Sequence, residues 1–290
     1  MSDLTLDCNY TGGAYTYHGL GLVGTSNTVR RVKVIHMARA SLANSESWGI
    51  IITASPVPDS EGNVIEDCEV SQFAGGSGCS AVSFNGGVTN AISGIIRNNR
   101  IRLAPTNGAA INGSWTHDCL IEGNYIDGAQ DGIYGDTGTS TDITVIRNTL
   151  RNCTHAISYH TAFRQNITIA SNTIEIASRP VQVYPTAFYF NPNASYKNII
   201  IRGNHVRNHG APEATPRFLN ACNISGLVVA GNTVDRSFTN ILSGCKGVAM
   251  YDNFDLTGKL LTNIHQRASP NAASGTVVSN RVIYDGAVHR

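Results

Sequence analysis

The stretch that decides the fold is CLIEGNYIDGAQDGIYGDTGTSTDITVIRNTLRNCTHAISYH, which runs from Cys119 to His160. One phrase occurs in it twice, as LIEGNYID around Asn124 and as TVIRNTLR around Asn148. The two asparagines are 24 residues apart. The stretch therefore reads as two copies of one structural unit.

The same phrase recurs along the chain at steps of 21 to 32 residues, with its asparagines at Asn99, Asn124, Asn148, Asn172, Asn204, Asn232, Asn253 and Asn280. Upstream, that position is filled by Cys68 in NVIEDCEV, Val32 in NTVRRVKV and Asn9 in LTLDCNYT. Eleven copies of one unit predict a solenoid. Because the repeat crosses every candidate boundary, residues 1–290 are predicted to form a single domain.

Three apolar positions recur within each copy and predict short strands. They lie three residues before the Asn, two after it and, in the regular coils, nine after it at Ile133, Ile157, Val181 and Ile241. Polar or small residues flank each in period two, which is typical of strands with one buried face. Three strands per copy predict an all-β, parallel coil of about ten to eleven turns, because each strand then pairs with its equivalent one coil later.

The recurring Asn lies between two strands, where a sharp bend favours a residue that tolerates left-handed dihedrals. Its amide can also hydrogen-bond to its counterparts in neighbouring coils, which predicts an Asn ladder at one corner. With this ladder the sequence resembles the right-handed parallel β-helix family, the pectin-lyase-like superfamily. The resemblance implies the fold, and it makes polysaccharide lyase, glycoside hydrolase or phage tailspike functions expected.

Composition narrows the classes of function. A net charge of +1 with 14% charged residues argues against nucleic-acid binding. No apolar segment is long enough for a membrane span, and the start MSDLTLDCNY lacks a signal-peptide layout. The seven cysteines are expected to be free thiols, with Cys119 and Cys153 buried at core positions. Because the chain begins on a strand phrase, an N-terminal cap is expected to be absent, and residues 259–273 are expected to be irregular.

The third strands of four consecutive copies align as AINGSW (110–115), GIYGDT (132–137), AISYHT (156–161) and PVQVYP (180–185). With the apolar position inward, the polar side chains of these coils gather on one outer face. The set comprises Asn112, Ser114, Asp131, Tyr134, Asp136, His155, Ser158, His160, Arg179, Gln182 and Tyr184. Since chemically active groups are denser here than elsewhere in the chain, this face is the predicted site.

These residue types suit β-elimination on an acidic polysaccharide. Arg179 would neutralise a uronate carboxylate, and His155 or His160 would remove the C5 proton. Tyr134 or Tyr184 would protonate the leaving oxygen. We favour this metal-independent elimination as the predicted reaction.

Hydrolysis is the alternative reaction on the same face. Asp131 and Asp136 would then act as acid and base, one of them with a partner from another coil. Trp115 and the tyrosines would stack on sugar rings, while Asn112 and Gln182 would hold the substrate. A non-catalytic glycan-binding or structural solenoid remains the rival interpretation, because polar residues on the outside of a β-helix also serve simply as its solvated face.

The motifs of several characterised relatives are missing. The chain lacks the Arg-x-Pro-x-Arg signature of calcium pectate lyases, the Asp-Asp and Gly-His-Gly segments of polygalacturonases and the Asp-Pro-His segment of mannuronan epimerases. No cluster has calcium-loop or zinc spacing, so neither a metal nor a cofactor is expected.

Four residues before the recurring Asn, an apolar stripe is expected on the outer surface at Ile95, Leu120, Ile200 and Val228. Such a stripe favours a cover such as a partner subunit, although strand-forming residues also occur there without a partner. The tailspike members of the family pack side by side as trimers, so the resemblance implies a homotrimer that works outside the cell or on a virion. Excursions at 184–197 and 209–217 are expected to wall the groove.

Overall fold

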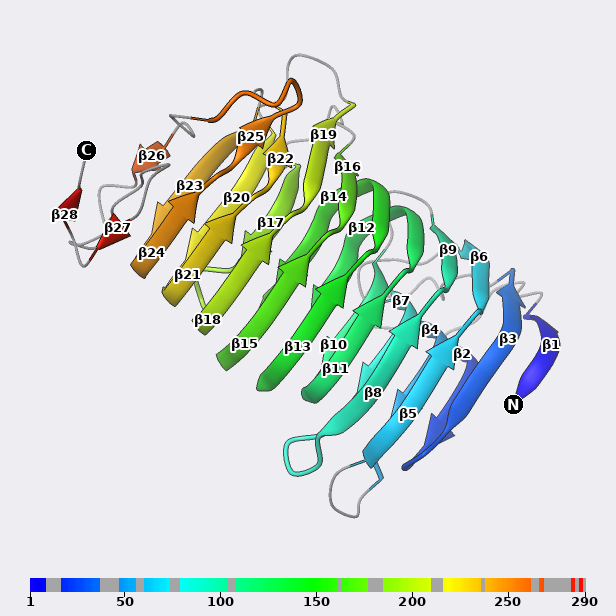
Figure 1. Cartoon of the computed structure of the whole chain (residues 1–290). Helices are drawn as coiled ribbons and strands as arrows, with labels where there is room; N and C mark the ends of the chain where they lie inside the picture. The colour runs from blue at the N-terminus through cyan, green and yellow to red at the C-terminus, as the bar shows by residue number, and fades with distance from the viewer. Residues whose placement is uncertain are drawn as a thin grey trace.

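The computed structural model describes residues 1–8, 17–36, 47–55, 60–73, 79–103, 108–160, 163–176, 185–209, 216–235, 238–261, 266–268, 283–284 and 287–288. The regular secondary structure of these residues consists of β-strands, which stack along one axis in chain order (Figure 1). None of the described segments is a helix long and apolar enough to cross a membrane.

Three columns of parallel strands form the wall of the solenoid. The first column precedes the ladder corner and contains β3 (Thr28–Ile35), β5 (Ser60–Glu66), β8 (Ile92–Arg97), β11 (Thr116–Glu122), β13 (Ser140–Ile146), β15 (Phe163–Ala170), β18 (Ser195–Arg202), β21 (Ile224–Ala230) and β24 (Lys246–Tyr251). Each of these strands from β3 to β21 pairs with the strand one coil later, as the repeat predicts.

The second column follows the corner. It contains β1 (Ser2–Asp7), the end of β3, β6 (Glu69–Phe73), β9 (Arg100–Leu103), the first halves of β12 (Tyr125–Gly135) and β14 (Thr149–Tyr159), β16 (Thr173–Ile176), β19 (His205–Asn208), β22 (Thr233–Val234) and β25 (Phe254–Asp255).

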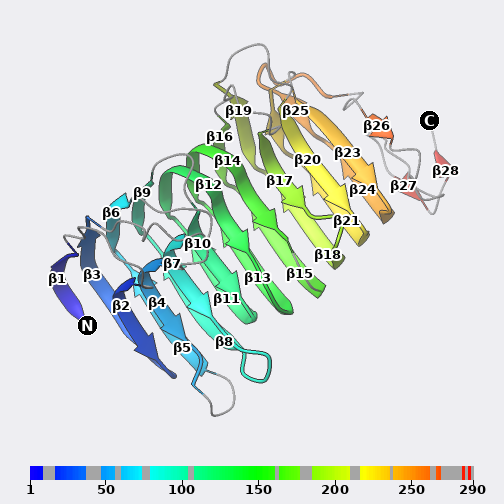
Figure 2. The same cartoon turned by 180° about the vertical axis from the view of Figure 1, so that it is seen from behind.

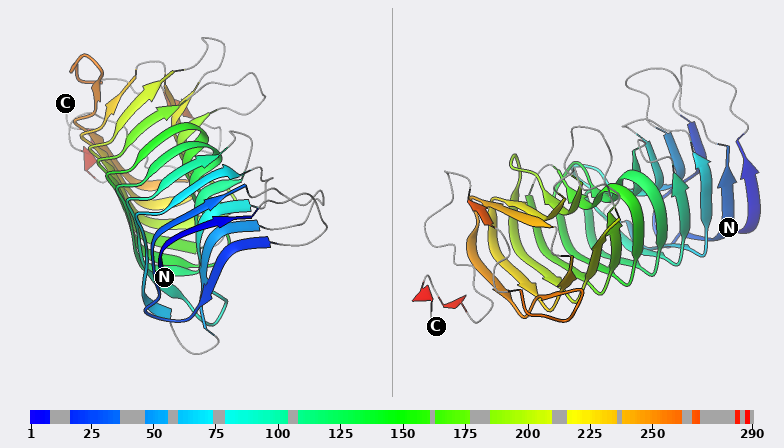
Figure 3. Two further views of the ribbon diagram at one scale, coloured as in Figure 1. Left: turned by 90° about the vertical axis from the view of Figure 1, so that its right-hand side faces the viewer. Right: turned by 90° about the horizontal axis from the view of Figure 1, so that it is seen from above.

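The third column contains β2 (Tyr17–Val23), β4 (Ser47–Thr53), β7 (Cys79–Asn85), β10 (Ala109–Ser114), the second halves of β12 and β14, β17 (Thr186–Phe190), β20 (Arg217–Cys222), β23 (Thr239–Ser243) and β26 (Gln266–Ala268). The view from behind and the two further views show this succession from the blue to the orange end (Figures 2 and 3). The segment expected to be irregular, 259–273, thus includes a paired strand. Beyond it, β27 (Ile283–Tyr284) and β28 (Ala287–Val288) form a separate antiparallel pair.

The interior is one continuous apolar cluster. The positions predicted to face inward before and after the ladder residue are buried, for example Val145 and Leu150, both at 0% exposure. The seven cysteines, all of them among the described residues, form no disulfide, and Cys119 and Cys153 are buried as expected. The all-β parallel solenoid is therefore confirmed.

The Asn ladder is present from Asn99 to Asn253. The Oδ1 atom of Asn148 accepts hydrogen bonds from both the backbone N and the Nδ2 of Asn124, each at 2.9 Å. The Nδ2 of Asn148 donates to the backbone oxygen of Ile121 and to the Oδ1 of Asn172, and the rungs up to Asn253 repeat the pattern. The backbone N of Cys68, which replaces the Asn, donates to the Oδ1 of Asn99. Both amide atoms of Asn148 are thus used within the stack.

The bend at this corner does not depend on the ladder residue itself, contrary to the expectation. The left-handed residue is the one immediately before it, namely Arg31, Asp67, Asn98, Gly123, Arg147, Ser171, Gly203, Gly231 and Asp252. The ladder asparagines serve as hydrogen-bonding side chains, and the preceding position carries the backbone turn.

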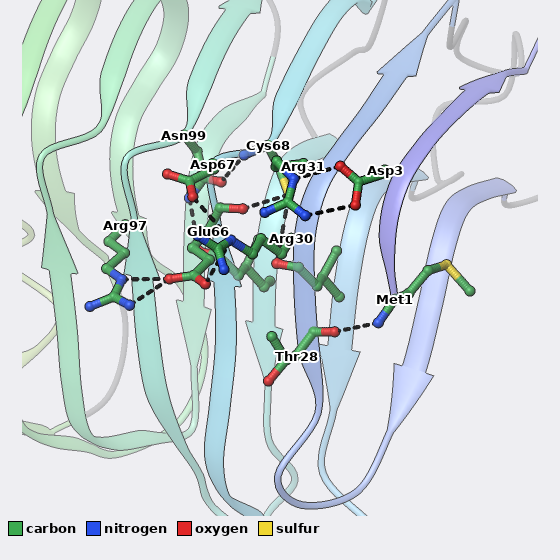
Figure 4. A network of polar contacts seen from close by, with 12 residues as sticks. Met1, Asp3, Thr28, Arg30, Arg31, Glu66, Asp67, Cys68, Arg97 and Asn99 are labelled. Carbon is green, nitrogen blue, oxygen red and sulfur yellow. Dashed lines mark hydrogen bonds and ion pairs between the residues drawn. The ribbon is translucent and has the colours of Figure 1, made fainter.

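Next to this corner, charged side chains pair across coils. Glu66 lies between Arg97 and Arg30, as Figure 4 shows, with 2.7 Å from the Nε of Arg97 to its Oε2. Glu66 is only 8% exposed, whereas both arginines reach solvent. These contacts tie the first coils together on the outer surface.

The first copy of the repeat begins earlier in the chain than predicted. Strand β1 pairs with β3 so that Leu4 lies opposite Val32 and Leu6 opposite Val34. Leu4, rather than Asn9, is therefore the counterpart of Val32, and Asn9 itself lies outside the described residues. Asn280 of the last predicted copy also lies outside them.

Candidate functional site

The predicted site lies on the third column, where three strands align as the repeat requires. Ile111 of β10, Ile133 of β12 and Ile157 of β14 are register partners and are buried. On the same strands Asp131 is opposite His155, and Tyr134 is opposite Ser158. The alignment of AINGSW, GIYGDT and AISYHT is confirmed.

The alignment of the fourth strand is wrong. The strand beside β14 is β17, in which Phe188, and not Val181, lies opposite Ile157. The coil carries extra residues between β16 and β17, and surface connections tolerate such insertions at little cost to the core. The predicted excursion at 184–197 is consequently the strand β17 followed by the start of β18. Arg179, Gln182 and Tyr184 lie outside the described residues.

Tyr189 occupies the outward position that the sequence alignment predicts for Gln182. It is the register partner of Ser158 and lies half-buried on the outer side of β17. The segment TAFYF has the pattern of a strand with one outward tyrosine and could have indicated Tyr189. The distance from Asn172, however, predicts this strand too early in the chain. The prediction that Ile241 faces inward is also wrong, because Asn240 lies opposite Leu219 and Ile241 is half-exposed.

A local bend brings Asp131 to the same face as Tyr134. Gly132 points toward the core, since an added Cβ would lie 2.7 Å from the Cδ2 of Leu150 and 3.1 Å from the Sγ of Cys153. Ile133 is also buried, so the alternation of the strand is interrupted between Asp131 and Tyr134. Glycine permits this close approach, and both polar side chains reach the outer side.

Asp131 is the centre of the site. Its Oδ1 lies 3.0 Å from the Nδ1 of His155 and accepts a 2.6 Å hydrogen bond from the Oγ of Ser158. The Nε2 of His160 is 3.8 Å from the same oxygen. Asp131 is 6% exposed, and His155 is 8% exposed. A carboxylate that accepts from Nδ1 fixes the imidazole tautomer and leaves the lone pair on Nε2.

Two tyrosines enclose the histidines. The ring of Tyr189 stacks on His155 at 4.9 Å and lies 5.1 Å from His160. The ring of Tyr134 meets His160 edge-on at 4.9 Å, and its hydroxyl donates to the Oδ1 of Asp136 at 3.0 Å. Five of the predicted catalytic residues, His155, His160, Asp131, Asp136 and Tyr134, therefore form one contact network.

Burial sets the protonation of these groups. It lowers the pKa of His160 below its usual 6.5, against the opposing effect of Asp131, so this imidazole is neutral at neutral pH. Burial also raises the pKa of Tyr134, with a further contribution from Asp136. The pKa of Tyr189 is raised by burial as well. Both phenols stay protonated and can donate a proton.

Two predicted binding residues flank the network on its N-terminal side. Asn112 is half-exposed, is the register partner of Tyr134 and accepts a 3.4 Å hydrogen bond from the Oγ of Ser114. The ring of Trp115 packs against Gly138, where an added Cβ would lie 2.0 Å from a ring carbon. Trp115 is half-buried, so part of its surface is available to a ligand.

A buried arginine lies beneath the site and was not predicted. Arg164 is 0% exposed and donates to the Oγ of Ser140 and to the backbone oxygen of Asp136, each at 2.5 Å. Its guanidinium lies 5.4 Å from the centre of the Tyr159 ring, and burial lowers its pKa. It anchors the turn that follows Asp136 from the inside.

On the first column, the apolar stripe lies on the outer side as expected. Ile95, Leu120, Ile200 and Val228 are all half-exposed. Nearby, the described residues form an open groove of about 770 Å³, lined by Thr144, Thr168, Ser171, Arg202, Tyr251 and their neighbours. This face is separate from the cluster around Asp131, which belongs to the third column.

The comparisons with known proteins agree with this architecture. Residues 18–194 match the family model of the right-handed β-helix region, and the chain belongs to that family. No curated protein sequence matches the chain.

Solved structures with the same fold come from several sources. A tailspike protein mutant of E. coli bacteriophage HK620, in complex with pentasaccharide, is 14% identical with a TM-score of 0.54, over 93% of this chain and 57% of that one. The surface protein and adhesin PfbA of Streptococcus pneumoniae is 12% identical with a TM-score of 0.52, over 90% and 81%. The DFA-IIIase of Arthrobacter chlorophenolicus is 12% identical with a TM-score of 0.52, over 89% and 69%.

The chain spans about half the length of the tailspike chains that it matches, 46% of one and 57% of another. At these identities the likeness shows the fold alone.

Proposed function

We propose that the chain binds a polysaccharide on the outer face of β12, β14 and β17 and cleaves it by β-elimination at uronate residues. The observation that carries the proposal is the network in which Asp131, His155 and His160 lie between Tyr134 and Tyr189. A structural neighbour whose ligand is a pentasaccharide is consistent with a carbohydrate ligand. The proposed setting is extracellular or on a virion.

His155 is the proposed base. Its contact with Asp131 directs the Nδ1 proton inward and leaves the Nε2 lone pair for the C5 proton of the substrate. Loss of that proton and rupture of the C4–O4 bond give an unsaturated uronate, and the leaving oxygen takes a proton from a phenol. Tyr189 is the proposed donor, because the hydroxyl of Tyr134 already donates to Asp136. The predicted role of Arg179, to neutralise the uronate carboxylate, stays part of the proposal.

Elimination is favoured over hydrolysis by the contacts of the two carboxylates, Asp131 and Asp136. The Oδ1 of Asp131 is already engaged by His155 and Ser158, so it is not directed at a leaving oxygen. Asp136 accepts from Tyr134. A hydrolase needs one carboxyl group that is protonated and directed at the leaving oxygen.

A screen of acidic and neutral polysaccharides tests the proposal. The absorbance of unsaturated uronate and the yield of reducing ends are followed together. His155→Gln should abolish both signals, whereas His36→Gln, at an exposed histidine that follows β3, should retain them. Reducing ends without absorbance would indicate hydrolysis. Binding without either product would indicate the glycan-binding solenoid, and no binding on any substrate would contradict both.

The second part of the proposal is that three copies of the chain pack side by side through their first columns as a homotrimer. The half-exposed stripe at Ile200 and Val228 supports it, because apolar strand faces favour a cover. Light scattering during size-exclusion chromatography measures the assembly. Val228→Lys should dissociate it, whereas Val88→Lys, at a residue that is 80% exposed, should not. A monomeric parent chain would contradict this part.

A further inference from the structure

The centre of the site is also a set of metal donors. Asp131, His155 and His160 each offer one donor atom, and the three atoms all lie within 4.8 Å of one another. The measured separations from the Oδ1 of Asp131 are 3.0 Å to His155 Nδ1 and 3.8 Å to His160 Nε2. The residues come from two coils and are 24 and 5 positions apart in sequence, which matches no metal-binding motif.

These separations are close to those of a coordinated ion. Zinc binds imidazole nitrogen and carboxylate oxygen at about 2.0–2.2 Å, so two donors of a tetrahedral site are about 3.3–3.6 Å apart. The contacts of Asp131 fall on either side of this range. The donor atoms of His155 and His160 lie within 4.8 Å of each other, so the two imidazoles must approach each other when an ion binds.

Two further features fit an ion at this place. The Nε2 of His160 is buried and has no hydrogen-bond partner among the described residues, although buried polar atoms are usually paired. Ser158, at 0% exposure, donates to Asp131 from behind, as residues that orient a metal-binding carboxylate do. The donor set of two imidazoles and one carboxylate suits zinc and leaves a fourth position open.

We propose that Asp131, His155 and His160 bind a Zn²⁺ ion and that the bound ion inhibits the elimination. The inhibitory part rests on the proposed function. Coordination through Nδ1 of His155 displaces the ring proton to Nε2, so the lone pair that removes the C5 proton is lost. Substrate cleavage and zinc binding therefore compete for the same imidazole.

Binding is measured on the full chain without substrate. The protein is treated with EDTA, dialysed and titrated with ZnCl₂ by calorimetry, and with CoCl₂ by visible absorption, which reports four-coordinate cobalt through its intense d–d bands. One ion per chain is expected. His160→Gln should weaken the affinity about 100-fold and Ser158→Ala about tenfold. His209→Gln, which keeps all three donors, should leave the affinity unchanged.

No heat and no cobalt band would overturn the zinc site, as would equal affinities for the parent chain and the His160→Gln and Ser158→Ala variants. Far-UV circular dichroism checks that each variant is folded, and Ser158→Ala decides the question if His160→Gln is not. Because these readouts need no substrate, they remain valid if no polysaccharide is cleaved. On a cleaved polysaccharide, Zn²⁺ should inhibit and EDTA should restore the rate. Activation by Zn²⁺ would overturn the inhibitory role.

Discussion

Two groups of buried polar side chains differ in how completely they are hydrogen-bonded. At the ladder corner, Asn124, Asn148 and Asn172 are each 1% exposed, and their amides bond to the coils on both sides. On the third column, Asp131 and His155 are almost as buried, yet the neighbouring His160 Nε2 has no partner among the described residues. Two more such atoms, Tyr159 Oη and Arg164 Nε, lie close beneath.

The difference follows from repetition along the stack. A side chain that recurs in consecutive coils can be paired by its own copies, so burial costs it no hydrogen bonds. A cluster that occurs once in the stack has no copies to complete it. Its remaining bonding capacity is available to a ligand, a substrate or an ion.

The largest expected effect is at the ladder. Asn148→Ala removes the acceptor of Asn124 and the donor to Ile121, and leaves these groups buried and unpaired. We expect a loss of about 3 kcal/mol or more in the free energy of unfolding, measured with urea and circular dichroism. Asn166→Gly removes exposed hydrogen bonds to Asp142 and Asn198 and tolerates the left-handed backbone at this position, so it should cost less than about 1 kcal/mol. Equal losses would break the comparison.

At the site, Asp131→Asn should lower the rate of cleavage more than it lowers the free energy of unfolding. The amide can donate to His155 Nδ1, which reverses the tautomer and removes the lone pair from Nε2. The rate of unsaturated uronate formation should fall about 100-fold, or about 2.7 kcal/mol in activation free energy. Asp142→Asn, at an exposed aspartate on β13, provides the matched control. An undiminished rate in Asp131→Asn would remove His155 from the role of base.

Gly132→Ala tests the local bend of β12 between Asp131 and Tyr134. The added Cβ would lie 2.5 Å from the backbone oxygen of Ala156, so the strand must shift. A destabilisation of about 2 kcal/mol is expected, with reduced cleavage because Asp131 moves. Gly87→Ala, whose Cβ would meet nothing within 4 Å, should be neutral. A neutral Gly132→Ala would mean that the bend is not required.

The smallest effect is expected at the outer ion pairs of Figure 4. Arg97→Ala removes the contact with Glu66, which keeps Arg30 as a second partner. The loss should stay below about 1 kcal/mol and shrink further in high salt. Arg202→Ala, at an exposed arginine on β18, gives the baseline for losing a surface side chain. A loss as large as that of Asn148→Ala would mean that exposed pairs contribute as much as the ladder.

The sequence predicted most of the core and most of the cluster. Ile133 and Ile157 were identified as inward, and His155, His160, Asp131, Asp136 and Tyr134 as one group, because the copies around Asn124 and Asn148 have equal length. The prediction failed where one copy of the repeat differs in length from the next. The insertion before β17 hid Tyr189, and the bulge at β20 misplaced Ile241.

Two other features could not be predicted from the positions of residues within the repeat. Arg164 occupies a strand position one residue after Phe163 and looks like a surface charge, yet the structure buries it completely. The left-handed position before each ladder residue includes Asp, Asn, Arg, Ser and Gly, so no single residue type signals it.

By itself, the sequence determined the parallel stacking, the buried asparagine row and the face that carries the imidazoles and carboxylates. These follow from periodicity, because identical units that cannot bury their apolar faces alone must stack. Only the tertiary structure decided which groups touch: Asp131 contacts His155, and Tyr189 contacts both histidines. It also decided that the Nε2 of His160 has no hydrogen-bond partner among the described residues. Such contacts depend on bends and connection lengths in neighbouring coils, which no single copy of the repeat contains.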